Sequence, residues 1–248
     1  MAARECSATI APIRCLVCGV ALDGALFCSA HPVGIGPDPP RCGRCDGPLP
    51  AAFPDRERCA ACRREQRGPS RILALCDYRD DKGLRECVLA LKHGGRRDLA
   101  DPLGALLALR WQKALALEPG RQEDPGAVLF VAVPLHPFRR LERGYDQAQL
   151  LAQALADHLG ARACAALERR RDSLPQGSPG CASRAANVRG LFKVKRRQRG
   201  RVAGAHIWLV DDVVTSGATL TECACALRRG GANRVCAIVL AHAGGLGQ

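Results

Sequence analysis

Apolar and polar positions alternate in two repeating patterns along the chain from about residue 84 onward. Short apolar runs, typical of buried strands, lie at 127–133, 206–210 and 235–241. Between and before them, apolar residues recur at helical spacing over 84–93, 99–117, 147–159 and 220–229. Strand and helix in alternation predict an α/β fold, a mostly parallel sheet with helices on both faces. In such sheets ligands bind at the carboxyl ends of the strands.

One predicted strand-to-helix junction carries unusual polar residues. The strand from His206 is followed by Asp211 and Asp212, two valines, and then small hydroxyl residues around Gly217 up to Thr219. The carboxylates suit two sugar hydroxyls, and the loop can turn its N–H groups toward a phosphate, with Gly217 allowing close approach. We therefore expect a ribose 5-phosphate site. The plain structural alternative is a buried strand, a polar turn and a capped helix.

Cysteines are concentrated near the N-terminus, mostly in pairs separated by two residues. Each pair can present two ligands to one ion, and two pairs close a tetrahedral structural zinc site. The first site would use Cys15, Cys18, Cys28 and His31, and the second Cys42, Cys45, Cys59 and Cys62. Two alternatives stay open. The cysteine pairs can be combined differently between the two sites, and His31, which precedes Pro32, can be a plain loop residue. Because this segment is short, it can form only a small hydrophobic core. Bound zinc would therefore supply much of its stability. Most of the other cysteines are more simply small buried residues.

Charge and linkers complete the organisation of the chain. A polar linker at 63–70 separates the cysteine-rich part from the rest, so we expect a zinc ribbon over 1–68 and a second domain over 69–248. The net charge of +13 favours an anionic partner, whether phosphate, pyrophosphate or nucleic acid. A GC-rich genome would explain the preference for Arg over Lys, but not the excess of positive charge. We expect no secretory signal and no membrane insertion, and a cytoplasmic location.

These motifs resemble known families. The string from His206 to Thr219 is similar to the phosphoribosyl pyrophosphate (PRPP) signature of type I phosphoribosyltransferases. Three further segments at 91–95, 133–147 and 167–176, the last followed by Arg184, Asn187 and Phe192, resemble the ComF family of bacterial competence proteins when taken with the cysteine pairs. The resemblance runs from about Cys15 to the end of the chain. It implies a type I phosphoribosyltransferase fold behind a double zinc ribbon, and a role in DNA uptake during natural transformation.

The resemblance also implies roles for individual residues. Asp211 and Asp212 would hold the ribose 2- and 3-hydroxyls, with Mg²⁺ nearby. The 5-phosphate would be held by Thr215, Ser216, Gly217, Ala218 and Thr219, and the pyrophosphate by Arg139, Arg143 and Lys92. The loop 169–180 would close over the site during pentosyl transfer. A solvated basic face is the structural alternative for the arginines.

The chain departs from the family pattern in a few places. The family usually has Arg-Gly-Phe-Asn-Gln where this chain has Tyr145 and Asp146 within 143–147. Aspartate in place of asparagine removes a hydrogen-bond donor, which argues against a direct anion contact there. Ser173 replaces a usual threonine, and His31 a usual cysteine.

Other functions use the same features without phosphoribosyl transfer. One is a nucleotide-binding module, and another is a single-stranded DNA-binding or adaptor protein. The segment Lys193–Arg201 carries six positive charges and no acid, which suits a phosphate backbone, although a solvated β-hairpin is the simpler interpretation. The zinc ribbon would then hold nucleic acid, or a partner such as a DNA-uptake helicase or a recombination protein.

Overall fold

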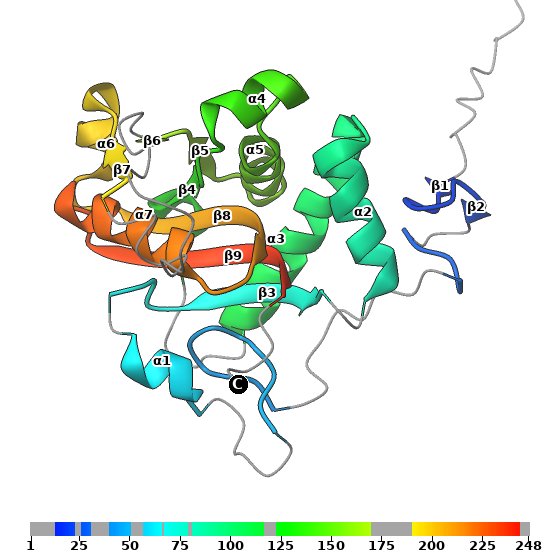
Figure 1. The fold of residues 1–248 in the computed structure, drawn as a ribbon, viewed down its shortest axis with the longest axis horizontal. Helices are drawn as coiled ribbons and strands as arrows, with labels where there is room; N and C mark the ends of the chain where they lie inside the picture. The colour runs from blue at the N-terminus through cyan, green and yellow to red at the C-terminus, as the bar shows by residue number, and fades with distance from the viewer. Residues whose placement is uncertain are drawn as a thin grey trace, which may run out of the picture.

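The computed structural model describes residues 13–22, 26–30, 40–50, 57–65, 67–78, 81–116, 123–169 and 190–243. Its centre is a five-stranded sheet in the order β3-β9-β8-β4-β5, and every neighbouring pair is parallel (Figure 1). The strands are β3 (Ile72–Asp77), β4 (Val128–Ala132), β5 (Arg162–Cys164), β8 (His206–Val214) and β9 (Arg234–His242). The predicted α/β class with a parallel sheet is confirmed.

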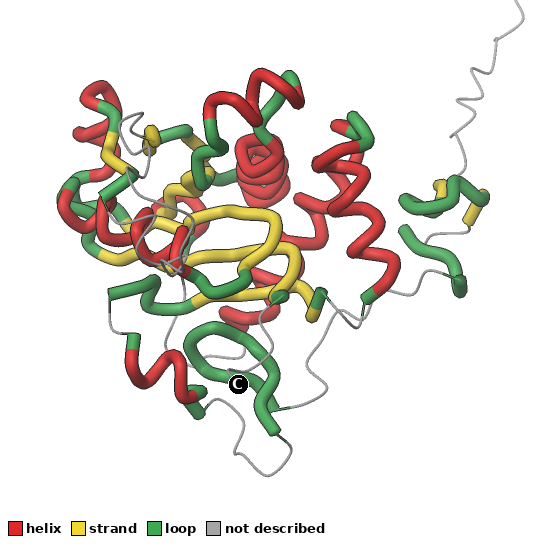
Figure 2. Tube along the Cα trace, in the orientation of Figure 1, coloured by secondary structure: helices red, strands yellow, loops and turns green. Residues whose placement is uncertain are grey.

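Helices cover both faces of this sheet (Figure 2). One face packs against α2 (Lys82–His93), α3 (Ala100–Ala116) and α5 (Gln147–Leu159), and the other against α7 (Ala218–Arg229). Side chains alternate along β8, so that Trp208 enters the first core and Ile207 and Leu209 enter the second. Because both faces are buried, the central strands are apolar over most of their length.

The closest approach between helices brings α5 against α3. A Cβ atom added at Gly104 would lie 2.5 Å from the Cβ of Ala154, so only glycine fits this crossing. Helix α5 begins after Asp146, whose carboxylate accepts a hydrogen bond from the Gln149 N–H, and ends at Gly160 with φ +63°. The start of α5 is thereby held beside the carboxyl ends of β4 and β8.

Short elements complete the described chain. They are β1 (Ile13–Arg14), β2 (Ala21–Leu22), α1 (Ala60–Arg64), the 3₁₀ turns η1 (Arg97–Leu99), η2 (Pro125–Ala127) and η4 (Arg196–Gln198), α4 (Pro137–Arg143), β6 (Leu167–Arg169), β7 (Phe192–Val194) and α6 (Arg199–Val202). None of the described helices has the length and apolar character that a membrane crossing requires.

Two predicted elements differ from the structure. The strand expected at 206–210 continues to Val214, because β9 pairs alongside it as far as His242. Both carboxylates therefore lie within the strand. The basic segment 193–201 is a hairpin only at its start, where β7 pairs antiparallel with β6. The chain then turns through η4 and α6, so the simple hairpin interpretation is wrong for most of the segment.

The cysteine-rich turn at 42–47 lies against the outer edge of β3, as the blue turn beneath that strand in Figure 1 shows. The Arg44 carbonyl accepts the Ile72 N–H at 2.5 Å, and Asp46 Oδ2 accepts the Ala74 N–H at 2.9 Å. The same Asp46 oxygen lies 2.5 Å from Arg110 of α3. An open strand edge is a ready site for unwanted pairing, and here the turn covers it.

Candidate functional site

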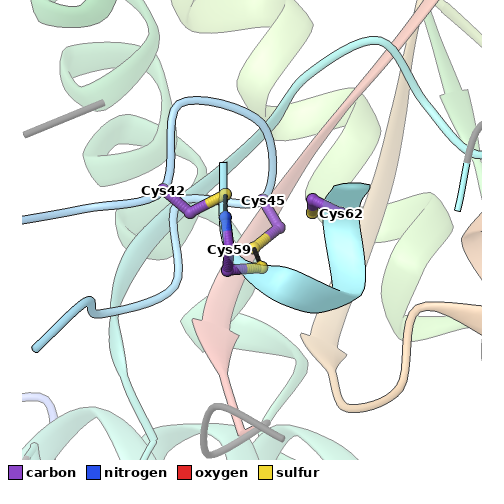
Figure 3. Close-up of side chains that lie close together, drawn as sticks. All are labelled: Cys42, Cys45, Cys59 and Cys62. Atoms are coloured by element: carbon purple, nitrogen blue, oxygen red, sulfur yellow. Dashed lines mark hydrogen bonds between the residues drawn. The ribbon is translucent and has the colours of Figure 1, made fainter. Parts of the chain in front are cut away.

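Four cysteines converge beneath the sheet edge. The Sγ atoms of Cys42, Cys45, Cys59 and Cys62 all lie within 4.8 Å of one another, with Cys62 on helix α1 (Figure 3). Hydrogen bonds from the neighbouring Cys45 and Cys62 side chains hold the pKa of the Cys42 thiol far below its usual range, and the same contacts raise the pKa values of the Cys45 and Cys62 thiols. A thiolate is the form that binds metal. Four sulfurs at these distances suit a closed tetrahedral metal site.

A second group of cysteines lies near the strands β1 and β2. The Sγ atoms of Cys15, Cys18 and Cys28 lie within 4.8 Å of one another. Burial raises the pKa of the Cys15 thiol, but N–H groups of the surrounding turn outweigh this and lower it to about 6. His31, the fourth predicted ligand, lies outside the described residues. The structure thus brings together three of the four residues expected at this site.

Asp212 is the meeting point of three elements at the carboxyl end of the sheet. Its Oδ1 lies 2.9 Å from Lys92 Nζ at the end of α2, and its Oδ2 accepts a hydrogen bond from Gln147 Nε2 of α5 at 3.0 Å. Asp212 itself is 4% exposed. A buried carboxylate with both oxygens held in this way has a fixed orientation.

Asp211 lies next to it in a less favourable environment. Its Oδ1 accepts the backbone N–H of Asp212 at 2.9 Å. Burial, together with the negative charge of Asp212, raises the pKa of the Asp211 carboxyl well above its usual range, although Lys92 counteracts this. Nearby, Gln147 Oε1 is buried without a hydrogen-bond partner among the described residues. The pair of acids and this acceptor fit a ligand that brings a cation and hydroxyl donors.

A cavity of about 500 Å³ opens beside Asp212. It is lined by Lys92, His93, Arg139, Glu142, Arg143, Gln147 and Asp212. The three cations predicted to hold pyrophosphate therefore share one cavity with one of the predicted carboxylates. The volume falls in the range of small-ligand sites, and the mixture of cations and acids suits an anion accompanied by a metal ion.

The predicted phosphate loop lies at the same end of the sheet. Gly217 has φ +72° and precedes the first residue of α7, a conformation that favours glycine. Thr215 and Ser216 are exposed, and the Ser216 hydroxyl accepts from the Ala218 N–H at 3.5 Å. No residue of this loop is among those lining the cavity beside Asp212. The loop therefore follows β8, the strand that carries Asp212, and its role in phosphate binding stays a prediction.

Two residues of the site were not predicted from the sequence. Gln147 was assigned only to the start of a helix, and its position directly after the capping Asp146 was the available signal. Tyr145 donates a hydrogen bond from its hydroxyl to the Leu91 carbonyl, next to Lys92, and Arg97 lies 4.7 Å over its ring. The phenylalanine usual in the family lacks this hydroxyl. Asp146 caps α5 and accepts the Leu135 N–H at 3.3 Å, as an acceptor-only side chain should.

The chain is similar to a known protein family and to several named proteins. Residues 146–246 match the family model of the phosphoribosyl transferase domain. The chain is 33% identical over 204 residues to the DNA utilization protein YhgH of Salmonella typhimurium, covering 79% of this chain and 80% of that protein. For the protein of the same name from Escherichia coli K12 the identity is 30% over 197 residues, with the same coverage. Competence protein F of Haemophilus influenzae is 31% identical over 106 residues, 42% of this chain and 46% of that protein.

Proposed function

Because the chain belongs to the ComF family, we propose that it binds PRPP or a nucleotide with Mg²⁺ beside Asp212 and acts in DNA uptake. One observation carries the proposal. Lys92 and Gln147 converge on Asp212 at the rim of a cavity that also presents Arg139 and Arg143. Acids for a sugar and a metal ion, and cations for a pyrophosphate, then lie within one site.

The residues present fit a magnesium ion. Asp211 and Asp212 offer oxygen ligands, and burial together with the charge of Asp212 raises the pKa of Asp211, a shift that a bound cation would oppose. When bound, Mg²⁺ would neutralise charge on the pyrophosphate. Positive charge at this position would favour the ionised form of Asp211, and Lys92 would then exchange its contact with Asp212 for one with the anion. The Tyr145 hydroxyl holds the backbone beside Lys92, which keeps that cation at the rim of the cavity.

Any transfer activity would use the same contacts. As pyrophosphate leaves the sugar, Arg139, Arg143 and Lys92 would stabilise the growing negative charge. The carboxylates would orient the ribose and favour the positive charge developing on it. The segment that follows β6, expected to close over the site, would exclude water; most of it lies outside the described residues.

We also propose that the two cysteine groups hold structural zinc. The group of Cys42 presents four sulfurs and leaves no coordination position open, so zinc there would stabilise the fold and take no part in chemistry. The group of Cys15 would need a fourth ligand, for which His31 stays our prediction.

The proposal is tested by calorimetric titration of PRPP with Mg²⁺ into the zinc-loaded protein. We expect micromolar affinity that is lost when both Asp211→Asn and Asp212→Asn are introduced. The matched control is Asp98→Asn with Asp101→Asn, two exposed acids whose loss changes the net charge equally. Absence of binding by folded wild-type protein would overturn the proposal. Given binding, release of pyrophosphate in the presence of nucleobases would show whether transfer occurs.

Single-stranded DNA binding is the second candidate function. It is favoured by the exposure of Arg196, Arg197, Arg199 and Arg201 around η4 and α6. Phosphate contacts by these side chains would make affinity fall steeply with salt. Neutralising all four should weaken binding of an oligonucleotide, whereas the Asp211→Asn/Asp212→Asn variant should leave it unchanged.

A further inference from the structure

A second cavity lies between helix α4 and the hairpin of β6 and β7. Its volume is about 260 Å³. It is lined by Ala132, Pro134, Leu135, Pro137, Arg140, Asp146, Gln149, Ala165, Leu167, Glu168, Arg169 and Lys195. It shares no lining residue with the cavity beside Asp212. The two cavities are therefore separate places on the surface, and α4 contributes to both.

Three cations reach this second cavity from three elements. Arg140 comes from α4, Arg169 from the end of β6, and Lys195 from the residue after β7. No ion pair within the described part of the chain joins any of them to a carboxylate. The cavity is thus approached from several sides by positive charge.

The two carboxylates in the lining already have other partners. Asp146 caps α5 and accepts the Leu135 N–H, and Glu168 lies 3.2 Å from Lys193 on the neighbouring strand. Neither forms an ion pair with any of the three cations, and only Glu168 offsets part of the charge, that at Lys195. Two further cations flank the cavity, Arg139 on α4 and Arg197 in η4.

The cations are held together against their mutual repulsion. Burial lowers the pKa of Lys195, and the charges of Arg197 and Arg140 lower it further, while Glu168 offsets part of the effect. Burial and the charge of Arg139 likewise lower the pKa of Arg169. Arg169 and Lys195 are half-buried, whereas Arg140 is exposed, as Arg196 is. Two half-buried cations, with a third whose charge repels Lys195, leave room for an anion in the cavity.

Backbone hydrogen bonding fixes the main chain of two of the cations before any ligand arrives. The Lys195 N–H donates to the Ala166 carbonyl at 2.8 Å, and Arg169 pairs with Phe192 in the hairpin register. The Arg169 guanidinium lies 5.9 Å over the Phe192 ring. A site arranged in advance loses less conformational entropy on binding.

We propose that this cavity is a second phosphate site, which takes one phosphate group of a free nucleotide or of a nucleic acid strand. Two planar guanidinium groups and one ammonium suit a tetrahedral anion with several acceptor oxygens. The volume exceeds that of a water molecule, roughly 30 Å³, but is below the roughly 300 Å³ of a site that encloses a whole small ligand. The sugar and base of the ligand would therefore lie outside the cavity.

The chain offers a direct way to test this site, because it contains only five lysines. Lys195 lines the new cavity, Lys92 lines the cavity beside Asp212, and Lys193 lies beside the new cavity in an ion pair. Lys82 and Lys113 are exposed on other helices. Acetylation of each lysine, followed by mass spectrometry, therefore reports separately on the two cavities and on open surface.

The probes are inorganic phosphate, thymidine 5′-monophosphate and a ten-residue oligothymidylate, each added to the zinc-loaded protein. We expect at least one to slow acetylation of Lys195 about tenfold at saturation, with Lys82 and Lys113 unchanged. Protection by the two small probes would identify free phosphates as the ligand source, and protection by the oligonucleotide alone would identify a nucleic acid strand. Protection by none of them, or an equal slowing at all five lysines, would overturn the proposal.

Variants locate the effect. Arg140→Gln with Arg169→Gln should raise the probe concentration that protects Lys195 by roughly tenfold or more, since each lost contact is a charge-assisted hydrogen bond. The control, Arg64→Gln with Arg229→Gln, removes two exposed cations and should change it less than twofold. Thermal unfolding checks that both variants fold, and the wild-type labelling result stands without them. Equal effects of the two variants would contradict a specific site.

The Asp212→Asn variant separates this inference from the proposed function. It should abolish protection of Lys92 by PRPP with Mg²⁺ and leave protection of Lys195 by the phosphate probes intact. Loss of both together would mean that Lys195 reports on the PRPP site, and would overturn the second site. If the variant keeps both protection of Lys92 and protection of Lys195, the proposed function is overturned and the second site is not.

Discussion

Carboxylates are removed from water in two regions of this molecule, with opposite results. At the turn that covers β3, Asp46 accepts the Ala74 N–H and pairs with Arg110, whose Nε in turn donates to the Ala74 carbonyl at 2.9 Å. At the carboxyl end of β8, Asp211 and Asp212 lie side by side and share the single charge of Lys92.

The contrast distinguishes a structural acid from a binding acid. The charge of Asp46 is balanced by Arg110, so this region is complete as it stands and joins the cysteine-rich turn to the sheet. At the β8 pair, burial and then the charge of Asp212 raise the pKa of Asp211, and Lys92 offsets only part of this. A site that is electrostatically incomplete without a ligand marks function more reliably than burial does.

The largest effect should come from removing the ligands of the cysteine group under β3. Cys42→Ser with Cys59→Ser should lower the free energy of unfolding by at least about 5 kcal/mol, because structural zinc contributes folding energy outright. Urea unfolding monitored by circular dichroism measures this. Cys15→Ser with Cys18→Ser is the comparison, and should have a much smaller effect on the main transition, because the turn at 42–47 is the one that hydrogen-bonds to β3. Equal effects would contradict a special role for the turn at β3.

Breaking the balanced acid should have the next largest effect. Asp46→Asn leaves Arg110 partly buried without its counter-charge and should lower the free energy of unfolding by about 3 kcal/mol. The control is Asp101→Asn, whose side chain is 79% exposed and should change stability little. A loss of stability no greater than that of the control would show that the ion pair does not hold the turn to β3.

Replacing Asp211 with asparagine should raise the free energy of unfolding, the opposite of the effect expected for Asp46→Asn. The pKa of Asp211 in the folded protein lies above its unfolded value of 3.8, so the folded state retains a proton that the unfolded state loses. Stability therefore falls as pH rises from about 3.8 through the raised pKa. Asp211→Asn should remove this decline, making the metal-free variant more stable than wild type above that range and equal to it near pH 3. Thermal unfolding across pH measures it; greater stability of the wild type at pH 8 would contradict the prediction.

The smallest effect should come from the hydroxyl that Tyr145 adds to the family pattern. Tyr145→Phe removes its hydrogen bond to the Leu91 carbonyl and should cost about 1 kcal/mol of stability. Because that carbonyl lies next to Lys92, PRPP affinity should also weaken slightly. Calorimetry with Lys113→Gln as an exposed control checks this, and unchanged affinity would limit the role of the hydroxyl to stability.

Local patterns accounted for much of the fold. The helix expected at 147–159 coincides with α5, because a capping acid and a terminal glycine mark its ends within the sequence itself. The end of β8 was misjudged, since its extension to Val214 depends on pairing with β9, a partner distant in sequence. The hairpin predicted for the basic segment 193–201 was wrong for a similar reason. Its extent depends on pairing with β6, and that pairing covers only three residues.

The sequence by itself determined the parallel α/β class, the family, the cysteine groups and the adjacent acids of the β8 strand, because each is written in short-range spacing or in residue type. Only the tertiary structure decided that Lys92 and Gln147 meet at Asp212, that Asp46 and Arg110 join the cysteine-rich turn to β3, and that Arg140, Arg169 and Lys195 surround one cavity. Those encounters join residues far apart along the chain. Their charge balance exists only once the sheet and its helices bring them together, and residue type alone does not reveal which charges will be left without a partner.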